Sequence, residues 1–364
     1  MKKKLNIGLI FGGRSGEHEV SLISARSIWN ALDKNKYNII LIGISKKGYW
    51  HLGDSADFWI DHHDPKAIRL NLEAIQIIAE NKDGRIFLTK NGENLSHIDV
   101  FFPITHGVFG EDGCLQGFLE LLSAAYVGPN VLGSAVCMDK DVMKRLLIQA
   151  GISTARFYSL SRSQYNTKFL DKITRDLKFP IFVKPANTGS SVGISKAKNK
   201  KELREAIEEA FQYDNKIVLE EHIQGREIEC SVMGNEKPVA SVPGEIKLKS
   251  EFYSYEAKYL DESLAMPIPV ANLPKKTVKK IQELAIKVFK TLECEGMGRV
   301  DFFITPNGKI YVNEINTLPG FTSISMYPKM FEKSGLKFPA LLDKLIQLAL
   351  NRQRRNDKLK RSFA

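Results

Sequence analysis

The sequence predicts a mixed α/β protein in which a doubly wound parallel sheet is followed by smaller α+β units. Short apolar segments at 5–11, 38–44 and 100–104 have strand character and are separated by helical patterns. Strands that alternate with helices along the chain are typical of a parallel sheet. From Ile181 the pattern changes to short strands around one charged amphipathic helix, which indicates an α+β unit.

The elements of the first half follow from apolar periodicity. The three strands define the sheet, and the stretch 48–96 is polar enough to be interpreted as an irregular insertion in which His62 and His63 are exposed. Helices are expected at 20–32, at 115–122 and at 132–150, the last of them closed by Gly151 in the C′ position.

In the second half the periodicity predicts strands around short helices, with no internal repeat. Strands are expected at 181–184, 193–197 and 217–221, and helices at 201–211, 277–292 and 339–352. The stretch 243–269 reads as irregular, and residues 298–316 read as a hairpin.

Length and composition fit several packed cores and no membrane span. The 364 residues suffice for roughly two or three domains, and 43% hydrophobic with 26% charged residues is typical of a globular protein. No apolar run approaches the ~18–20 residues of a membrane-spanning helix. The apolar segment 5–11 continues into Gly12-Gly13-Arg14 rather than into a cleavage site, so a buried strand and a cytoplasmic location are expected.

Cysteine spacing and charge exclude two further classes of protein. Cys114, Cys137, Cys230 and Cys294 lie far apart without a C-x-x-C pair, which argues against a zinc site and a disulfide framework. The net charge of +11 raises the question of nucleic acid. Much of the excess lies near the chain ends, and no basic stripe is interleaved with aromatic residues, so no nucleic-acid partner is expected.

The hairpin at 298–316 carries a candidate metal site. Pro306-Asn307-Gly308 is a strong turn signal, and if Asn307 and Gly308 are the two loop residues, Asp301 faces Glu314 and Arg299 faces Asn316. Side chains alternate between the faces of a sheet, so these four residues share one face. The opposite, core face is then formed by Val300, Phe302, Ile304, Tyr311 and Ile315.

Chemistry assigns Asp301, Glu314 and Asn316 as ligands of a hard cation. Two carboxylates that face each other repel, and a divalent cation between them removes the repulsion. Oxygen ligands without His or Cys select magnesium or manganese over zinc. The alternative is an exposed hairpin whose acids pair with lysines, and a bulge would alter the pairing. The apolar strand after Asp301 favours a buried hairpin.

A second candidate is the loop between the strands at 181–184 and 193–197. Gly189, Ser190, Ser191 and Gly193 let backbone N–H groups approach an anion, and Lys184 adds a positive charge. The loop is not a Walker A motif, and the glycines near residue 12 do not form a dinucleotide fingerprint, so a nicotinamide cofactor is not expected. Alone, such a loop is more often a plain turn.

Longer motifs cover nearly the whole chain, from residue 10 to about residue 330. They comprise residues 11–22, 106–113, 126–129, 138–140, 189–193, 225–227, 252–259 and 313–322. Together they resemble the D-alanine–D-alanine ligase family. The resemblance implies an ATP-grasp fold preceded by a doubly wound parallel-sheet domain.

The resemblance also implies a division of the chain and an activity. The expected domains are an N-terminal α/β substrate-binding domain at 1–128, a small central ATP-grasp subdomain at 129–222, and a C-terminal ATP-grasp domain at 223–364 with the metal hairpin and a closing loop. The expected reaction joins two D-alanine molecules through an acyl phosphate, for peptidoglycan synthesis. ATP, two Mg²⁺ ions or Mn²⁺, and a homodimer are implied as well.

Site residues follow from the same resemblance. ATP would contact Lys140, Lys184, Ser191, Glu220, Ile223, Glu227 and Lys258. D-alanine would contact Glu17, His106 and Ser325. Catalysis would involve Glu17, Ser190 and Tyr259, which hold the closing loop, and Arg299 with the N–H of Gly320, which stabilise the tetrahedral oxyanion.

Several of these residues have a plainer interpretation. Glu220 can be a solvated strand end, Ser15 or Glu17 a helix N-cap, His106 a structural histidine and Arg299 an ion partner of Asp301 or Glu314. Tyr259 favours D-alanine over D-lactate as second substrate, while Ser254 departs from the family motif. A ligase for D-lactate or D-serine, and a non-catalytic nucleotide- or nucleic-acid-binding protein, are the alternative functions.

Overall fold

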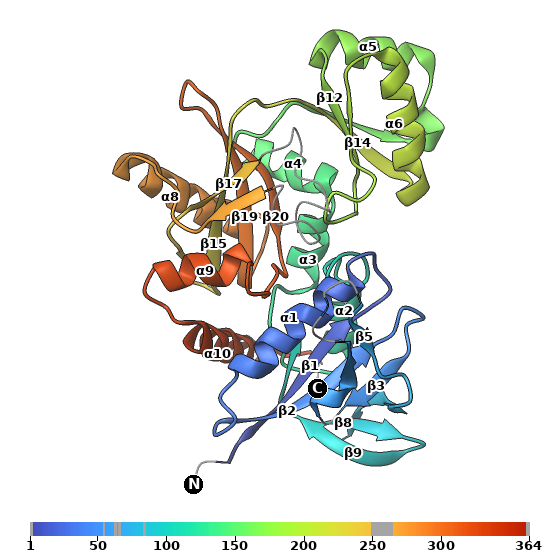
Figure 1. Ribbon diagram of the computed structural model, residues 1–364, viewed down its shortest axis with the longest axis vertical. Helices are drawn as coiled ribbons and strands as arrows, with labels where there is room; N and C mark the ends of the chain where they lie inside the picture. The colour runs from blue at the N-terminus through green and yellow to red at the C-terminus, as the bar shows by residue number, and fades with distance from the viewer. Residues whose placement is uncertain are drawn as a thin grey trace.

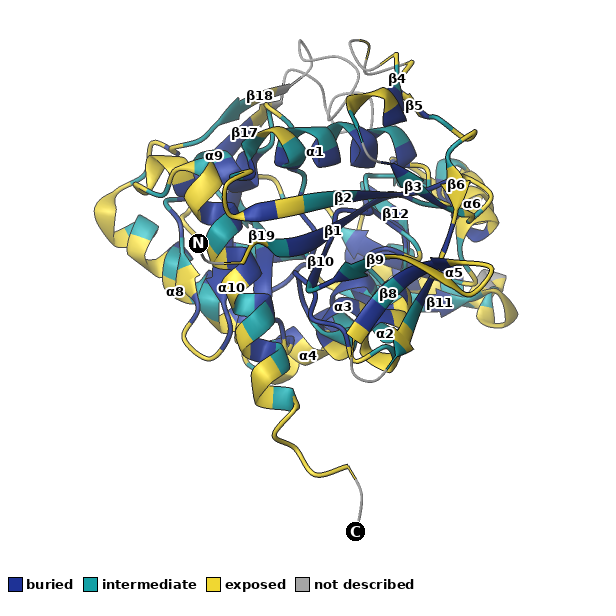
Figure 2. Cartoon of the chain, turned by 90° about the horizontal axis from the view of Figure 1, so that it is seen from below, coloured by how far each residue is buried: buried dark blue, intermediate teal, exposed yellow. Residues whose placement is uncertain are grey.

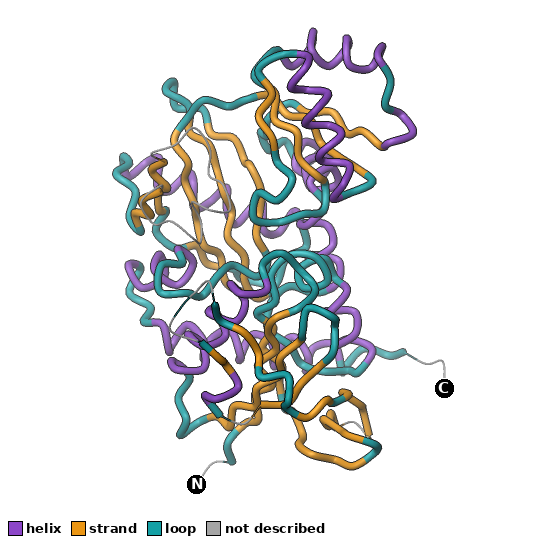
Figure 3. The backbone as a smooth tube through the Cα atoms, turned by 45° about the vertical axis from the view of Figure 1, so that its right-hand side comes forward, coloured by secondary structure: helices purple, strands orange, loops and turns teal. Residues whose placement is uncertain are grey.

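The computed structural model describes residues 3–53, 55–61, 64, 67–82, 85–248 and 265–361. The chain forms an elongated molecule with an α/β unit at one end and a small α+β unit at the other (Figures 1 and 3). A third unit, built on the sheet that contains β15, β19 and β20, lies between them (Figure 1). The boundaries expected after residues 128 and 222 stay predictions.

The N-terminal sheet has the strand order β10-β1-β2-β3-β6. The strands are β10 (Val100–Pro103), β1 (Leu5–Gly12), β2 (Tyr37–Ile44), β3 (Trp50–Gly53) and β6 (Ile75–Gln76). β1 pairs in parallel with β10 and β2, as the alternation of strands and helices predicted. β3 and β6 extend the sheet in antiparallel fashion. Helices α1 (His18–Ala31) and α2 (Cys114–Leu121) belong to this unit.

The prediction of an irregular insertion at 48–96 is wrong, because most of this stretch forms strands. Besides β3 and β6 it contains β4 (Trp59–Ile60), β5 (Arg69–Leu70), β7 (Ile78–Lys82), β8 (Arg85–Lys90) and β9 (Glu93–Ile98). β9 has mostly exposed or half-buried side chains, so its sequence lacks the apolar alternation of a core strand. His62 and His63 lie outside the described residues.

Two helices replace the single helix expected at 132–150. α3 (Val131–Met138) ends where α4 (Lys140–Gln149) begins, because Asp139 leaves the helical conformation. Its carboxylate accepts hydrogen bonds from the N–H groups of Asp141 and Val142 at 3.1 and 3.0 Å, as an N-cap does. Gly151 has a φ of +69°, which agrees with its expected C′ position.

The central sheet begins earlier than the change of pattern at Ile181. Its strands, in the order β11-β14-β12-β13, are β11 (Phe157–Ser161), β14 (Lys216–Glu221), β12 (Ile181–Pro185) and β13 (Ser195–Ala197). Helices α5 (Thr167–Leu177) and α6 (Lys200–Tyr213) share one buried cluster with these strands. β11 and α5 were not expected from the sequence.

The C-terminal sheet has the order β18-β17-β15-β19-β20, with β16 beside β15. Its strands are β15 (Arg226–Gly234), β16 (Val239–Ala240), β17 (Gly244–Leu248), β18 (Ala265–Ile268), β19 (Gly296–Ile304) and β20 (Ile310–Asn316). The prediction that 243–269 is irregular is therefore wrong at both ends of this stretch, where β17 and β18 form an antiparallel pair. Helices α8 (Lys275–Thr291), α9 (Met326–Lys333) and α10 (Phe338–Asn356) complete the unit, and short 3₁₀ turns occur at Ala56–Phe58 and Arg162–Gln164.

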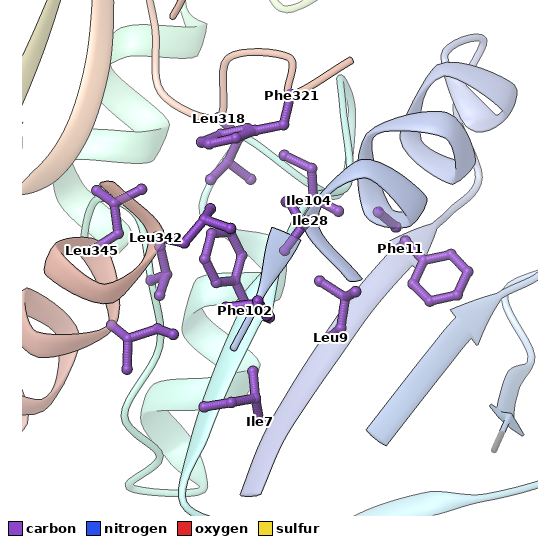
Figure 4. Close-up of a cluster of buried hydrophobic side chains, with 14 of the residues drawn as sticks. Ile7, Leu9, Phe11, Ile28, Phe102, Ile104, Leu318, Phe321, Leu342 and Leu345 are labelled. Atoms are coloured by element: carbon purple, nitrogen blue, oxygen red, sulfur yellow. The ribbon is translucent and has the colours of Figure 1, made fainter. Parts of the chain in front are cut away.

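The largest core joins the two ends of the chain. Ile7, Leu9 and Phe11 of β1 pack in one cluster with Phe321 and with Leu342 of α10 (Figure 4). Fully burying one such side chain contributes about 1.5–3 kcal/mol, so this cluster firmly fixes the 318–321 loop on the N-terminal unit. α1 shows the same arrangement in Figure 2, with its buried side facing the sheet.

Within the described part of the chain, none of the helices combines the length and the apolar character needed to cross a membrane.

Candidate active site

The hairpin of β19 and β20 has the predicted pairing at its functional end but a different turn. Ile304 pairs with Ile310, and the N–H of Thr305 donates to the carbonyl of Lys309, so Asn307 and Gly308 are not a two-residue loop. A bulge at Asn313 then shifts the register between Asp301 and Phe302. The longer turn and the bulge compensate each other, so Asp301 faces Glu314 and Arg299 faces Asn316 as predicted.

The same bulge corrects the predicted core face. Val300, Phe302, Ile304 and Ile315 are buried as expected. Tyr311 is not on that face, because it pairs with Phe303 and is only half-buried. The buried positions on β20 near the turn are Ile310 and Val312 instead.

A third carboxylate lies in register with the first two. Glu229 of β15 pairs with Asp301, which in turn pairs with Glu314 of β20, so three acidic residues form a row across neighbouring strands. Glu229 is 5% exposed and was not predicted as a site residue. Its position between the buried Ile228 and Cys230, on a strand where it alternates with Glu227, is the sequence signal that could have found it.

Arg299 neutralises part of this negative charge. Its Nε and Nη2 donate to Asp301 at 2.8 and 2.6 Å, and its Nε lies 3.3 Å from Glu229. Asn316 Nδ2 donates to Asp301 at 3.0 Å. The interpretation of Arg299 as an ion partner of Asp301 is therefore confirmed.

The donor set on this face fits the predicted metal. Among the residues that the structure describes, no three His, Cys, Asp or Glu side chains form a metal-binding group. The predicted set contains two carboxylates, and the amide oxygen of Asn316 completes it. Three hard oxygen donors on one face suit Mg²⁺ or Mn²⁺ and leave room for water and phosphate oxygens.

A cavity of about 230 Å³ lies between the central and C-terminal sheets. It brings the metal residues together with most of the predicted ATP residues. Its lining includes three residues of the metal face, which are Arg299, Asp301 and Glu314. It also includes five residues predicted to contact ATP, which are Lys184, Ser191, Glu220, Ile223 and Glu227. We call it the nucleotide cavity.

Glu220 is a buried charge and not a solvated strand end. The side chain is 3% exposed and pairs with Lys184 at 2.8 Å and with Lys144 at 3.2 Å. Burial would raise the pKa of Glu220, but the two lysines outweigh it and lower the pKa to about 2. Glu220 Oε1 is paired with Lys144 at 3.2 Å, and a carboxylate oxygen can accept more than one donor, so this ionised acceptor in the cavity wall also suits the amino group of adenine.

Lys144 was missed by the sequence reasoning. Its ammonium group is completely buried and also donates to the hydroxyl of Thr154 at 2.8 Å. Lys144 lies four residues after Lys140, on the buried side of α4. A lysine at such a position needs a buried acidic partner, and this requirement is the signal that could have revealed it.

Lys140 lines a smaller neighbouring cavity. This space shares Ser191 and Glu314 with the nucleotide cavity and is also lined by Ser190 and Asn316. Lys140 is buried, and its Nζ donates to the carbonyl of Thr188 at 2.6 Å. The amine thus lies at the loop that the sequence proposed for phosphate binding.

That loop has an unusual backbone. Ser190 and Ser191 have φ values of +47° and +63°, in the left-handed region that non-glycine residues rarely adopt. Ser190 Oγ donates a hydrogen bond to Glu17. A Cβ on Gly189 would lie 2.8 Å from Glu17 Oε2, so a side chain at 189 would displace the Glu17 carboxylate. Strain of this kind is found where a loop is held for a function.

Glu17 joins this loop to the N-terminal unit. It occupies the N-cap position of α1, as its plainer interpretation expected, although its side chain makes no capping hydrogen bond. Its charge adds to the effect of burial and raises the pKa of neighbouring Glu111 to about 8. Glu111, another residue missed by the sequence reasoning, accepts the N–H groups of Gly107 at 2.8 Å and Leu318 at 3.0 Å.

His106 is a buried link between two loops. One ring nitrogen, Nδ1, lies 3.0 Å from the carbonyl of Leu318, and the other lies 3.3 Å from Ser24 Oγ. Burial lowers its pKa to about 4, so the ring is neutral at physiological pH. These contacts agree with the structural interpretation of this histidine.

Gly320 and Ser325 lie together after the end of β20. A Cβ on Gly320 would approach Ser325 Oγ to 2.8 Å. The same Oγ accepts the N–H of Thr322 at 2.9 Å. Tyr259 and Lys258, like Ser254, lie outside the described residues.

Two family models match this chain. Residues 6–129 match the model described as "D-ala D-ala ligase N-terminus", and residues 146–347 match "D-ala D-ala ligase C-terminus". Among individual proteins, the D-alanine–D-alanine ligase of Oceanobacillus iheyensis is 49% identical over 364 residues, covering 100% of this chain and 99% of the relative. D-alanine–D-alanine ligase A of Chromobacterium violaceum is also 49% identical, with 99% of both chains covered.

Solved structures resemble the fold as well. The D-alanine–D-alanine ligase of Coxiella burnetii superposes with a TM-score of 0.84 at 41% identity, covering 98% of this chain and 96% of the other. The VanG D-Ala:D-Ser ligase of Enterococcus faecalis gives 0.82 at 36% identity, covering 95% and 100%.

Proposed function

The chain belongs to the D-alanine–D-alanine ligase family, and on this premise we propose how its own residues carry out the reaction. The protein has the ATP-grasp fold and uses ATP to join two D-alanine molecules into D-alanyl-D-alanine, a step of peptidoglycan synthesis. The observation that carries the residue assignments is the nucleotide cavity, where an ionised Glu220, Lys184 and the metal face meet.

ATP binds in this cavity between the two sheets. Glu220 Oε1, a buried acceptor with capacity beyond its ion pair with Lys144, receives the adenine amino group, and the backbone near Ile223 contacts the base. Glu227 holds the ribose. Lys140, Lys184 and Ser191 contact phosphate oxygens, with the predicted Lys258 reaching the γ-phosphate.

Asp301, Glu314 and Asn316 hold Mg²⁺, as two ions, or Mn²⁺. When bound there, the metal neutralises charge on the phosphate groups of ATP. Asp301 already accepts two hydrogen bonds from the guanidinium group of Arg299. The negative charge of this face would therefore be neutralised in part by Arg299 and in part by the metal ion.

The ligation proceeds in two steps. The carboxylate of the first D-alanine attacks the γ-phosphate, which gives an acyl phosphate and ADP. The amine of the second D-alanine then attacks the acyl carbon, and inorganic phosphate leaves. Arg299 and the N–H of Gly320 stabilise the oxyanion that forms on the carbonyl oxygen, which is the usual work of fixed donors at such a centre.

Residues of the N- and C-terminal units hold the two amino acids. The Glu17 carboxylate binds the ammonium group of the first D-alanine, near His106. Ser325 binds the carboxylate of the second. Ser190 and the predicted Tyr259 complete a hydrogen-bonded set with Glu17, and the Ser190–Glu17 contact supports it. Positioning of this kind turns the encounter of the two amino acids into an intramolecular step and so lowers the entropic part of the barrier.

An assay of ADP release with paired substrates tests the proposal. D-alanine is combined at neutral pH with a second D-alanine, with D-lactate or with D-serine. We expect the D-alanine pair to give by far the fastest ADP release. The D-serine arm is needed because one similar structure is a D-Ala:D-Ser ligase. ADP release with D-lactate or D-serine but not with a second D-alanine contradicts the proposal.

We further propose a homodimer and a cytoplasmic location, where ATP is available. Exposed apolar side chains on the N-terminal unit support self-association: Leu121 is 87% and Ile78 64% exposed. Asn81, on the same strand as Ile78, donates to the carbonyl of Leu122, so the two side chains belong to neighbouring elements. Light scattering after size-exclusion chromatography distinguishes a dimer from a monomer.

A further inference from the structure

Arg299 pairs with the carboxylates of Asp301 and Glu229, and of these Asp301 is a proposed metal ligand whereas Glu229 is not. Its guanidinium pairs with Asp301 through two hydrogen bonds, and its Nε also lies 3.3 Å from Glu229. Glu229 comes from β15, on the side of β19 opposite to Glu314. Asp301 therefore lies in the middle of the row, between a carboxylate of the metal set and one outside it.

Metal binding at Asp301 creates a difficulty for Arg299. A carboxylate that is shared with a divalent cation attracts a guanidinium group less strongly. The side chain of Arg299 is 17% exposed, and a mostly buried charge that loses its partner is costly. A second fixed anion beside Arg299 lowers the cost of sharing Asp301 with the cation.

The register favours Arg299, and not the cation, as the partner of Glu229. Neighbouring strands are about 4.8 Å apart, so Glu229 and Glu314 start about 10 Å apart across β19. Glu229 belongs to the same face as Arg299 and reaches its guanidinium within ion-pair distance.

We propose that Glu229 is a positioning residue, which holds Arg299 in place when a divalent cation binds Asp301. This inference rests on the metal site of the proposed function. It explains why a buried carboxylate, 5% exposed, lies next to two others that already repel each other. Through Arg299 it couples metal binding to the group that stabilises the oxyanion.

A double-mutant cycle on Mn²⁺ binding tests this role. The affinity for Mn²⁺ is measured by electron paramagnetic resonance, with a non-hydrolysable ATP analogue present, for the wild-type protein, Glu229→Gln, Arg299→Met and the double variant. We expect Glu229→Gln to weaken Mn²⁺ binding about tenfold in the wild-type background, a loss of about 1.4 kcal/mol of binding free energy. In the Arg299→Met background the same change should cost less than about threefold.

The opposite pattern overturns the inference. If Glu229→Gln weakens Mn²⁺ binding equally in both backgrounds, Glu229 acts on the cation directly or through its field, and not through Arg299. An unchanged affinity in the wild-type background overturns it as well. If even the wild-type protein with the analogue binds no Mn²⁺, the metal site of the proposed function fails instead.

The same sheet offers a matched control. Glu245 of β17 is 6% exposed and pairs with Arg226 of β15 at 2.8 and 2.7 Å, so Glu245→Gln also removes a buried carboxylate from an arginine. Its Mn²⁺ affinity should equal that of the wild type. Circular dichroism checks the fold of each variant. If Glu229→Gln does not fold, Glu229→Asp, which shortens the side chain by one methylene, replaces it in the cycle and is judged by the same comparison.

Discussion

At the scale of single residues, buried charges distinguish this site from an ordinary sheet surface. Glu220, Glu229 and Glu111 are buried or half-buried carboxylates, and each is held by a named partner. Such groups are costly to bury and are retained where they bind or orient something. Their partners show what each carboxylate does in the folded protein: Glu220 is kept ionised, Glu229 accompanies Arg299, and Glu111 accepts backbone N–H groups.

Glu314→Gln should abolish turnover without unfolding the protein. The amide keeps the size of the side chain but removes a charge that opposes Asp301, so the hairpin loses a repulsion while the metal loses a ligand. We expect ADP release to fall by at least about 10²-fold, the loss typical of one electrostatic group in a phosphoryl-transfer site. Thermal unfolding should remain at or above the wild-type midpoint. Full activity in this variant removes Glu314 from the metal site.

The raised pKa of Glu111 predicts that the stability of the folded protein depends on pH. Burial and Glu17 raise its pKa to about 8, from 4.5 for an unperturbed carboxyl. Between about pH 5 and pH 8 the folded protein therefore binds more protons than the unfolded chain, and the free energy of unfolding falls as pH rises. Glu111→Gln cannot ionise, so this fall should become flatter.

Urea unfolding at several pH values between about 5 and 8 measures the slope. The exposed Glu332, changed to Gln, is the control and should leave the slope of the wild type unchanged. An equal slope in the Glu111→Gln variant means that this carboxyl is already ionised in the folded protein.

At the scale of elements, the β19–β20 hairpin depends on one extra residue. The bulge at Asn313 returns the register to the one that aligns Asp301 with Glu314. Bulges redirect side chains next to functional sites, and this one decides which residues of β20 face the nucleotide cavity.

Deleting Asn313 should remove the bulge but keep the proposed metal residues aligned. Glu314 then follows Val312 directly and still faces Asp301 in a regular ladder, so we expect Mn²⁺ binding to survive the deletion. Asn313→Ala is the matched control, because it keeps the extra residue and removes only the 3.4 Å contact with Lys184. It should retain activity within about tenfold. Loss of Mn²⁺ binding in the deletion variant alone would mean that the bulge itself, and not only the pairing of Asp301 with Glu314, is needed at the site.

The junction of α3 and α4 shows a second element-level device. In one continuous helix, Lys140 would lie in the helix interior, and its N–H group would bond to a carbonyl of the preceding turn. The Asp139 cap instead starts a new helix at Lys140, whose N–H donates to the carbonyl of Ala186 at 3.0 Å. The cap thereby ties the start of α4 to the loop after β12, which we expect to bind phosphate.

At the scale of the whole molecule, the two chain ends are joined through the N-terminal unit. Arg352 of α10 is buried, donates to the carbonyls of Gly128 and Tyr126, and lies 4.3 Å above the Tyr126 ring. Together with the cluster around Phe321 it fixes the C-terminal unit on the N-terminal one. This contact holds the loop with Gly320 and Ser325 next to the residues expected to bind D-alanine.

Arg352→Ala should lower the free energy of unfolding by about 3 kcal/mol or more, because two hydrogen bonds from a charged donor and a ring contact are lost. Urea unfolding measures the change. Arg354→Ala, on the exposed side of the same helix, should change it by less than about 0.5 kcal/mol. Equal stability of the two variants would mean that the Arg352 contacts contribute nothing net.

The sequence by itself determined those features that follow from the periodicity of side chains along a strand or a helix. The alternation of side chains placed Arg299, Asp301, Glu314 and Asn316 on one face, and the apolar spacing located most helices and core strands. Its errors were local too: the two-residue turn, the Tyr311 face, the single helix at 132–150 and the irregular stretches. There a cap, a bulge or an exposed strand lacks a periodic signal.

Only the tertiary structure decided which of the acidic and basic residues act together. Glu229 lies beside Asp301 because β15 pairs with β19, and Lys144 of α4 forms an ion pair with Glu220 of β14. No local pattern covers these sequence separations. Strand order depends on how whole faces bury their apolar area, not on any short segment. For that reason the shared face of Asp301, Glu314 and Asn316 was predictable from the chain, whereas the charged residues that surround it were not.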